Sequence, residues 1–446
     1  MLDNLPDLIC MLFILVFFVF PSWAWMLYHE SKARKEQEEA LAAGRHEPAS
    51  ILPWINLKTC MGSGACVTAC PEDVLKVIDG QAVAVTASAC VGHGTCVAMC
   101  PVDAIDLVFG SENRGIDIPQ RDPKFQTNVP GLYVAGELGG MGLIANAIEQ
   151  GAQAMRNAGS GVTTRDDIWD VVIVGAGPAG LGAALVAKEL GLNFALLDQD
   201  SLGGAILHFP RKKLVFTRPV DIPGYGRVKV SQLEKEELVA LFQHVADSCG
   251  LTVQEGERVD QVLRQDDGTM LTVTPNNSYI SQRVLLCLGR RGTPRKLGVP
   301  GEEQEKVAYS LLEPELYQYQ HLLVVGGGDS AVEAAITLGE QEGTRVWLSY
   351  RKASLTRPKK KNIERLRKAV KEGRVELLLE STVSAIEADR VLLKQQGEEI
   401  VFPNDFVFVF AGGVLPTKFL QAAGIVVQRH HGKRVVELKA KREKSA

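Results

Sequence analysis

The chain has 446 residues, of which 46% are hydrophobic and 23% charged, with a formal net charge of -4. This length suits about three domains, and the composition is that of a globular protein. The slightly acidic balance argues against nucleic acid as a partner, because proteins that bind it present clustered positive charge. Six of the nine cysteines fall in two motifs. This distribution is unlike a secreted disulfide framework and favours metal ligation in a reducing compartment.

The N-terminal segment is apolar enough to cross a membrane. From Asp7 to Tyr28 it holds mostly apolar residues, about twenty of them, which at 1.5 Å per residue cover roughly 30 Å. Acidic residues precede the segment, and basic residues follow it (Lys32, Arg34 and Lys35). The positive-inside rule therefore predicts a single-pass anchor over residues 1–30 in the inner (cytoplasmic) membrane, with the catalytic domains in the cytoplasm. A cleaved signal peptide, which prefers a basic n-region, and a buried core helix are the alternatives. Residues 31–50 are predicted to form a polar helical tether.

Two cysteine-rich repeats of about thirty residues lie within residues 51–110. CMGSGAC begins at Cys60 and CVGHGTC at Cys90, and each is followed by a further cysteine and a proline. The usual cluster-binding run is C-x2-C-x2-C-x3-C-P. Its second cysteine is replaced by Ser63 in one copy and by His93 in the other. Zinc is an alternative, but it favours paired C-x2-4-C motifs, which this spacing does not provide.

The repeats resemble the two-cluster bacterial ferredoxin domain, and CPVDAIDL is a specific match. In that family three cysteines of one motif and the last cysteine of the other share a cluster. The resemblance implies one Fe–S cluster on Cys60, Cys66 and Cys100, and a second on Cys70, Cys90 and Cys96. Either [3Fe-4S] clusters bind, or Ser63 and His93 complete two [4Fe-4S] clusters. The remaining alternative is that both are turn residues that do not bind a cluster.

The first dinucleotide-binding pattern runs from Val171 to Asp200. An apolar strand leads into a G-x-G-x-x-G turn, a helix and a second strand that ends at Asp198. Such glycines let the backbone approach a pyrophosphate, the helix N-terminus supplies free N–H groups, and the acid binds the ribose hydroxyls. The pattern predicts an FAD site, with contacts at Gly175, Gly177, Pro178, Ala179, Gly180, Asp198 and Gly204.

A second unit of this kind runs from His321 to Lys352. Its glycine turn holds Gly326 and Gly328, and its helix begins with Asp329 and Ser330. The acid expected for NAD is absent, and cations stand near the end of the second strand: Arg351, Lys352 and Arg357. Cations at this point favour the 2′-phosphate of NADP, so we predict NADPH, with NADH as the alternative. Residues 359–367 are predicted to form a solvated basic helix.

The two units, with GGGDSAVEAA in the second, resemble the low-molecular-weight thioredoxin-reductase family of flavoproteins over residues 111–440. The resemblance implies a homodimer and an FAD domain (166–300) into which an NAD(P) domain (301–410) is inserted through a two-stranded hinge. Residues 411–446 would return to the FAD domain and end in a tail. The predicted fold class is α/β, with two Rossmann-like domains, a small α+β ferredoxin domain (51–110) and an N-terminal transmembrane helix.

The order of segments departs from that family. The family's last FAD segment resembles VPGLYVAGEL, in which an acid after glycine binds ribityl or phosphate oxygens of the flavin. Here it carries Gly136 and Glu137, and it lies within residues 111–165, before the first glycine turn. We infer a circular permutation, which is plausible where a domain's ends lie close together. It predicts that the C-terminal strands (GIVVQRHHGKRVVEL) pack near residues 115–135.

A second departure concerns the reaction. Disulfide-reducing members carry C-x-x-C in the NADP domain, but the corresponding segment, EKVAYSLLEPELYQYQ, has no cysteine. His208 lies in the stretch that lines the flavin in that family, where it tunes the flavin or is merely structural. The parts predict a membrane-tethered NAD(P)H-dependent oxidoreductase that passes electrons between NADPH, FAD and two Fe–S clusters to a redox protein or a quinone. A non-catalytic redox sensor and reverse flow that reduces NADP+ are the alternatives.

Overall fold

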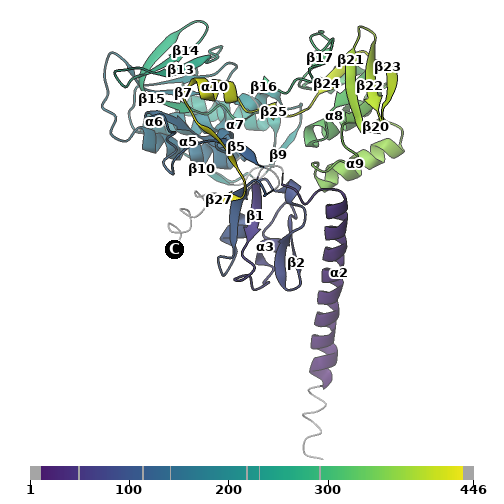
Figure 1. The fold of residues 1–446 in the computed structure, drawn as a ribbon. Coiled ribbons are helices and arrows are strands. Elements are labelled where there is room, and N and C mark those ends of the chain that lie inside the picture. The colour runs from purple at the N-terminus through teal and green to yellow at the C-terminus, as the bar shows by residue number, and fades with distance from the viewer. Residues whose placement is uncertain are drawn as a thin grey trace, which may run out of the picture. The chain divides into compact units, whose positions relative to one another are not determined.

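The structure, a computed structural model, describes residues 12–48, 51–112, 115–140, 142–216, 219–230, 232–290 and 293–434. The first residues of the predicted anchor and residues 435–446 of the predicted tail lie outside the described residues. The chain forms two compact units, which Figure 1 draws as ribbons. The first comprises Met1–Arg114 with Gly432–Ala446, and the second is Gly115–His431.

The first unit begins with one long helix. A π-helical turn, η1 (Leu15–Val19), continues into α2 (Phe20–Ala42). Leu12–Ala42 is long and apolar enough to cross a membrane, by length and composition only, and the side chains of its apolar part are exposed. The polar part of α2, in the segment that the sequence predicts as a polar helical tether, packs on the cysteine-rich domain. Ala33 and Ala40 are buried there together with Ile78 and Val85.

The cysteine-rich domain is a small α+β fold. Strand β1 (Ile51–Ile55) pairs antiparallel with β4 (Ile105–Phe109), and β2 (Leu75–Ile78) forms a hairpin with β3 (Gln81–Ala84). The short helices α3 (Ala65–Thr68) and α4 (Thr95–Ala98) each follow a cysteine loop, and η2 (Ala87–Ala89) precedes the second loop. Strand β27 (Lys433–Arg434) adds to β4. We predict that residues 411–446 return to the FAD domain and end in a tail, and β27 lies in the last part of that segment.

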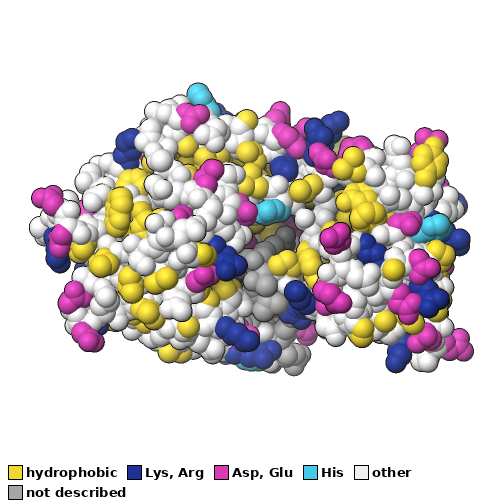
Figure 2. Space-filling view, turned by 90° about the horizontal axis from the view of Figure 1, so that it is seen from above, with side chains coloured by type: hydrophobic (Ala, Val, Ile, Leu, Met, Phe, Trp, Pro, Cys, Tyr) yellow, Lys and Arg dark blue, Asp and Glu magenta, His cyan; other side chains and the backbone are white. Residues whose placement is uncertain are grey.

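Side chains of both charge signs lie on the face seen in Figure 2. Cationic and anionic side chains are interspersed there, among small apolar patches. A mixed surface of this kind agrees with the formal net charge of -4.

The first large sheet of the second unit contains the first glycine turn. Its strand order is β13 (Gln261–Arg264), β14 (Met270–Val273), β15 (Ser278–Leu286), β7 (Trp169–Val174) and β8 (Phe194–Leu197). Strand β6 (Leu132–Val134), which precedes all of these in the chain, pairs parallel with β15. Strand β5 (Ile116–Pro119) pairs antiparallel with β26 (Val427–His430). The predicted packing near residues 115–135 is therefore confirmed for β26, whereas β27 pairs with β4, and residues 435–438 of the predicted strands lie outside the described residues. The β5–β26 pairing supports the inferred permutation.

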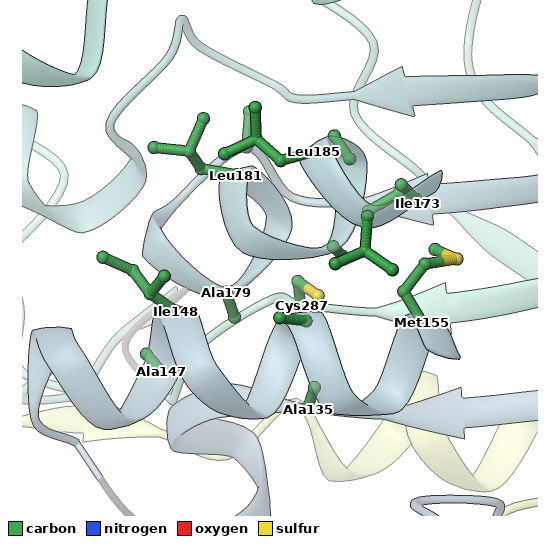
Figure 3. Close-up of a cluster of buried hydrophobic side chains, with 14 of the residues drawn as sticks. Ala135, Ala147, Ile148, Met155, Ile173, Ala179, Leu181, Leu185 and Cys287 are labelled. Atoms are coloured by element: carbon green, nitrogen blue, oxygen red, sulfur yellow. The ribbon is translucent and has the colours of Figure 1, made fainter. Parts of the chain in front are cut away.

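Two helices beside this sheet pack very closely against each other. They are α5 (Ile144–Ala158), from the shifted segment, and α6 (Pro178–Glu189). A Cβ on Gly151 would overlap the Ala179 carbonyl, and one on Gly182 would overlap the Ile148 carbonyl. Figure 3 shows the side chains of both helices meeting Ile173 and Cys287 in one buried cluster. The shifted segment is thus part of the core of this sheet.

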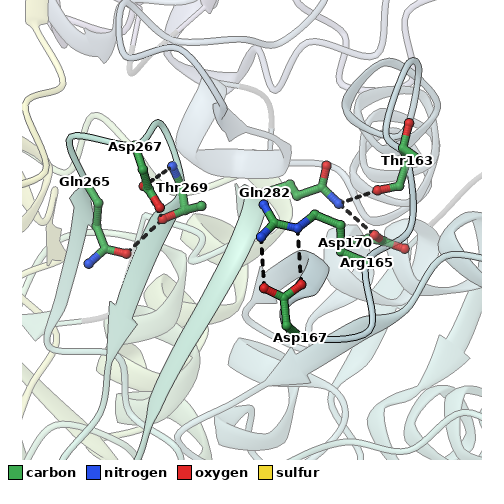
Figure 4. A network of polar contacts seen from close by, with 8 residues as sticks. All are labelled: Thr163, Arg165, Asp167, Asp170, Gln265, Asp267, Thr269 and Gln282. Atoms are coloured by element: carbon green, nitrogen blue, oxygen red, sulfur yellow. Dashed lines mark hydrogen bonds and ion pairs between the residues drawn. The ribbon is translucent and has the colours of Figure 1, made fainter.

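The junction before β7 is held by hydrogen bonds, drawn in Figure 4. The Gln282 amide donates to the Thr163 carbonyl at 2.8 Å and to the buried Asp170 carboxylate at 2.9 Å. Thr164 also donates to Asp170, at 2.9 Å. These contacts fasten Thr163 and Thr164, in the segment that connects α5 to β7, to Asp170 of β7 and Gln282 of β15.

The second large sheet is entirely parallel. Its order is β17 (Val307–Ala308), β24 (Phe406–Val409), β18 (His321–Val325), β19 (Arg345–Tyr350) and β20 (Val375–Leu379), with helices α8 (Asp329–Gly339) and α9 (Lys360–Lys371). Strands β16 (Thr293–Pro294) and β25 (Gly413–Val414) pair where the chain enters and leaves this region, as a two-stranded hinge would. The other described elements are η3 (Gly136–Gly139), η4 (Gly204–His208), β9 (Leu214–Phe216), β10 (Val220–Ile222), β11 (Gly226–Val228), β12 (Gln232–Glu234), α7 (Lys235–Ser248), η5 (Pro314–Tyr317), β21 (Ser381–Ile386), β22 (Arg390–Gln395), β23 (Glu398–Pro403) and α10 (Thr417–Ala422).

Glu302 fixes the linker that follows the hinge. Its buried carboxylate accepts hydrogen bonds from the N–H groups of Leu297 and Gly298 at 2.6 and 2.7 Å, and from the Tyr309 hydroxyl at 2.8 Å. Burial raises the pKa of the Glu302 carboxyl, but these hydrogen bonds outweigh it, so that the pKa lies below its usual value. The linker therefore depends on an ionised Glu302.

Candidate cofactor sites

The six motif cysteines surround two hollows in the first unit. Site A is lined by Cys60, Cys66 and Cys100, and Ser63 lines it as well. Site B is lined by Cys70, Cys90 and Cys96, together with His93. The structure thus brings together the two sets of three cysteines that the ferredoxin resemblance implied, each with the residue that replaces the missing cysteine.

The two cysteine loops have the same backbone conformation. The glycines on either side of Ser63 have φ values of +66° and +72°, and those on either side of His93 have +83° and +79°. Left-handed residues of this kind are accessible mainly to glycine. Ser63 and His93 consequently occupy equivalent positions, although Ser63 is exposed and His93 is half-buried.

Backbone N–H groups point at the cysteine sulfurs. The sulfurs of Cys70 and Cys100 each accept a hydrogen bond from the residue four positions later, at 3.5 and 3.2 Å. The Cys60 sulfur accepts one from Ala82 at 3.4 Å. N–H donors of this kind stabilise cluster thiolates and tune the reduction potential.

The arrangement fits a polynuclear cluster better than a single ion. Burial raises the pKa of Cys90 to about 11 and that of Cys96 to about 12, so these thiols need a bound cation to ionise at neutral pH. Among the described residues, no three cysteine, histidine or carboxylate side chains converge closely enough to hold one metal ion. Sulfurs spaced around a hollow instead leave room for iron and sulfide.

The first glycine turn is shaped for a pyrophosphate. Gly175 has a φ of +102°, and a Cβ on Gly180 would overlap the Gly175 carbonyl, so α6 starts directly against the end of β7. Around Gly177 there is more space, since a Cβ there would lie 3.9 Å from the nearest atom, Cα of Gly204. Pro178 and Ala179 form the first turn of α6. This opening at a helix N-terminus fits a bound dinucleotide phosphate.

Asp198 lies beside this turn, at the end of β8. Its carboxylate accepts hydrogen bonds from the N–H groups of Ala176 at 2.6 Å and Asp200 at 2.9 Å. Burial raises the pKa of the Asp198 carboxyl, while these two N–H donors act in the opposite direction. A carboxylate has about four lone-pair positions, so acceptor capacity remains for ribose hydroxyls.

The shifted segment brings Gly136 and Glu137 to the same turn. A Cβ on Gly136 would lie 2.8 Å from the Ala179 side chain, and the Gly136 N–H donates to Gln150 of α5 at 3.2 Å. Arg290 is partly buried near Glu137. Burial lowers the pKa of the Arg290 guanidinium, and this effect exceeds the opposite effect of the negative charges on Glu137 and Asp117. Gln150 and Arg290 were not among the contacts predicted from the sequence, although both lie in segments that resemble the family.

His208 lies on the surface. It ends η4, and its ring Nε2 lies 3.1 Å from the Asp200 carboxylate, with 51% of the histidine side chain exposed. This contact agrees with the structural interpretation of His208, and its role at a flavin stays a prediction.

The second glycine turn has its own supporting contacts. Gly326 has a φ of +149°, and Gly328 precedes α8. The Asp329 carboxylate accepts hydrogen bonds from the Lys359 N–H at 2.8 Å and from the Asn362 side-chain amide at 2.7 Å. Asn362 is buried and was not foreseen from the sequence. These bonds tie the start of α9 to the start of α8.

The predicted phosphate-binding cations lie in the sequence between the start of α8 and the start of α9. Arg351, Lys352 and Arg357 are all exposed, and Ser330 is half-buried at the beginning of α8. Tyr350, in contrast, is buried, and its ring fills the space that a side chain at Gly327 would need. Exposed cations at the end of β19 suit a 2′-phosphate.

Comparison with known proteins identifies the class as an FAD/NAD(P) oxidoreductase joined to a cluster-binding domain. Residues 172–443 match the family model for pyridine nucleotide-disulphide oxidoreductases, and the chain belongs to this family. Residues 52–101 match the 4Fe-4S dicluster domain. The matches support FAD, NADP and two Fe–S clusters as cofactors, and they make the chain an NAD(P)H-dependent oxidoreductase.

The relatives are named as reductases. The chain is 31% identical over 277 residues to ferredoxin--NADP reductase of Thermus thermophilus, covering 59% of this chain and 79% of that protein. It is 24% identical over 267 residues to bacilliredoxin reductase Bdr of Bacillus subtilis, covering 59% of this chain and 82% of the relative. Bacillithiol disulfide reductase Bdr (YpdA) from Staphylococcus aureus shares the fold, with a TM-score of 0.53, 23% identity, and coverage of 58% and 81% of the two chains. The predicted combination of a reductase fold with a ferredoxin domain is confirmed.

Proposed function

We propose that this protein is a membrane-tethered NADPH-dependent flavoprotein that passes electrons through two Fe–S clusters to a redox protein or a quinone. The observation that carries the proposal is the presence, in one chain, of two three-cysteine hollows and a reductase fold. When bound, FAD accepts a two-electron hydride from NADPH and can release electrons singly, which suits clusters that accept one electron at a time.

In this proposal each large sheet is a Rossmann-like domain that binds one dinucleotide. The turn at Gly175–Gly180 binds the FAD pyrophosphate, Asp198 accepts hydrogen bonds from the ribose, and Glu137 binds ribityl or phosphate oxygens. The turn at Gly326–Gly328 binds NADPH, and the exposed cations after β19 bind its 2′-phosphate. The glycine geometry of both turns supports these roles.

The N-terminal helix spans the inner membrane in this proposal, and the two units are cytoplasmic. The apolar, exposed side chains of Leu12–Ala42 support the anchor. We further propose a homodimer, by analogy with the thioredoxin-reductase family.

The direction of electron flow follows from the potentials of the clusters. The name of the Thermus thermophilus relative, ferredoxin--NADP reductase, suggests that reduction of NADP+ by low-potential clusters is the reverse mode of the same enzyme.

A steady-state assay tests the proposal. The holoprotein should oxidise NADPH with artificial electron acceptors over many turnovers, and NADH more slowly. A single stoichiometric oxidation without turnover would instead point to a redox sensor in which the clusters regulate.

A further inference from the structure

The hairpin β2–β3 is held against the start of the polar part of α2. Asp79 at the hairpin turn donates its N–H to Glu30 at 3.0 Å. Arg34 forms ion pairs with both of these carboxylates. Glu30 and Arg34 lie two and six residues after Tyr28, the last aromatic residue of the apolar segment. The turn of this hairpin is therefore fixed next to the end of the apolar helix.

The site A loop, defined as residues 57–66, lies against the same hairpin turn. Gly62 packs so tightly on Gly80 that a Cβ on Gly62 would overlap the Gly80 carbonyl. The Gln81 amide donates to the Leu57 carbonyl at 2.8 Å. Site A is thereby held at the level of Glu30 and Arg34 along α2.

The site B loop, the equivalent residues 87–96, is fastened beside the C-terminal end of α2. Ser88, two residues before Cys90, donates its N–H to the Arg45 carbonyl at 3.0 Å, just past the last helical residue, Ala42. From Glu30 to Ala42 an α-helix rises about 18 Å. Figure 1 shows the domain lying alongside this half of the helix.

The thickness of a bilayer places site A at the lipid headgroups. Beyond the hydrocarbon core of about 30 Å, each headgroup layer is about 5–8 Å thick, or roughly three to five helical residues. With Tyr28 at the edge of the core, the layer extends to about residue 33. Two large apolar side chains of the site A loop are exposed there: Leu57 is 54% exposed and Met61 is 64% exposed.

We propose that the site A loop contacts the lipid headgroup layer through Leu57 and Met61, whereas the site B loop stands clear of the membrane. This inference rests on the proposed function, in which the N-terminal helix spans the bilayer. It assigns the two clusters different roles: site A faces partners confined to the membrane, and site B does not.

Site-specific photo-crosslinking to lipid tests this. The full-length holoprotein is reconstituted into phosphatidylcholine/phosphatidylglycerol vesicles with a benzophenone side chain at position 25, 57, 61 or 91. Val91 occupies in CVGHGTC the place that Met61 has in CMGSGAC, and it is also exposed, so position 91 is the matched control. Iron content and cluster absorbance verify that each variant is intact.

We expect lipid adducts at positions 25, 57 and 61, and only background at position 91. Adducts at 25 without adducts at 57 and 61 would overturn the inference and leave the membrane anchor standing. No adduct at 25 would overturn the anchor itself, and the inference with it. Equal yields at 61 and 91 would show that the two loops do not differ in distance from the lipid, which also overturns the inference.

Discussion

Replacing Gly177 by alanine separates cofactor binding from folding at the first glycine turn. The added methyl group would lie 3.9 Å from Cα of Gly204 and 4.0 Å from the Gly203 carbonyl oxygen, which is ordinary van der Waals contact. Gly177 has a φ of -72°, which alanine also adopts. The free energy of unfolding of the apoprotein should therefore change by less than about 0.5 kcal/mol.

FAD binding should respond far more strongly. A pyrophosphate against this turn would meet the methyl group, and forcing a methyl into an occupied space typically costs about 1–3 kcal/mol. At about 1.4 kcal/mol per factor of ten, FAD should bind roughly 5- to 150-fold more weakly. Titration of the apoprotein with FAD, followed by flavin fluorescence, measures this change.

The matched control is Gly328→Ala, at the equivalent position before α8. No atom of a described residue lies within 4 Å of a Cβ placed there. This variant should bind FAD as the wild type does and should bind NADPH more weakly. Wild-type FAD affinity in Gly177→Ala would refute the placement of the FAD pyrophosphate at the first turn.

Three further changes have defined outcomes. Gly62→Ala, at a φ of +66° and against a neighbouring carbonyl, should remove the site A cluster and leave that of site B, measured by iron content and paramagnetic resonance. Glu302→Gln should lower the free energy of unfolding by about 1.5–3 kcal/mol at pH 7, with Glu303→Gln as the exposed control. The pKa of Glu302 is lower in the folded protein than in the unfolded chain. The stabilisation by its carboxylate is therefore present above the unfolded pKa and is lost as the pH falls through the folded pKa. Denaturant unfolding at several pH values should show that the difference in free energy of unfolding between wild type and Glu302→Gln disappears at low pH. Arg351→Ala should raise KM for NADPH but not for NADH, whereas Arg367→Ala, on the exposed face of α9, should change neither.

Local motifs were readable from the sequence. Each glycine turn joins an apolar strand to a helix within a few residues, so the turns at Gly175 and Gly326 follow from neighbouring residues alone. The grouping of Cys100 with Cys60 required the family resemblance. The two cysteines belong to different repeats and are about forty residues apart in the sequence, and no periodicity within either repeat reveals their grouping.

Long-range contacts that no family resemblance implies could not be predicted from the sequence. The packing of α2 on the cysteine-rich domain depends on small apolar faces, such as Ala33 against Ile78. The sequence pattern of a polar helix does not indicate which part of the chain it packs against. The bond between Asp329 and Asn362 joins two helices that are separated by a strand and a loop. Contacts of this kind are decided by the packed fold rather than by local sequence.

Electron transfer from NADPH into the cysteine-rich domain is tested most directly by rapid mixing under anaerobic conditions. The holoprotein is mixed with NADPH while flavin and cluster absorbance are followed, and frozen samples are taken for paramagnetic resonance. The flavin should bleach first, and cluster reduction should follow within turnover. A flavin that is reduced while clusters reducible by dithionite stay oxidised would contradict the proposed path.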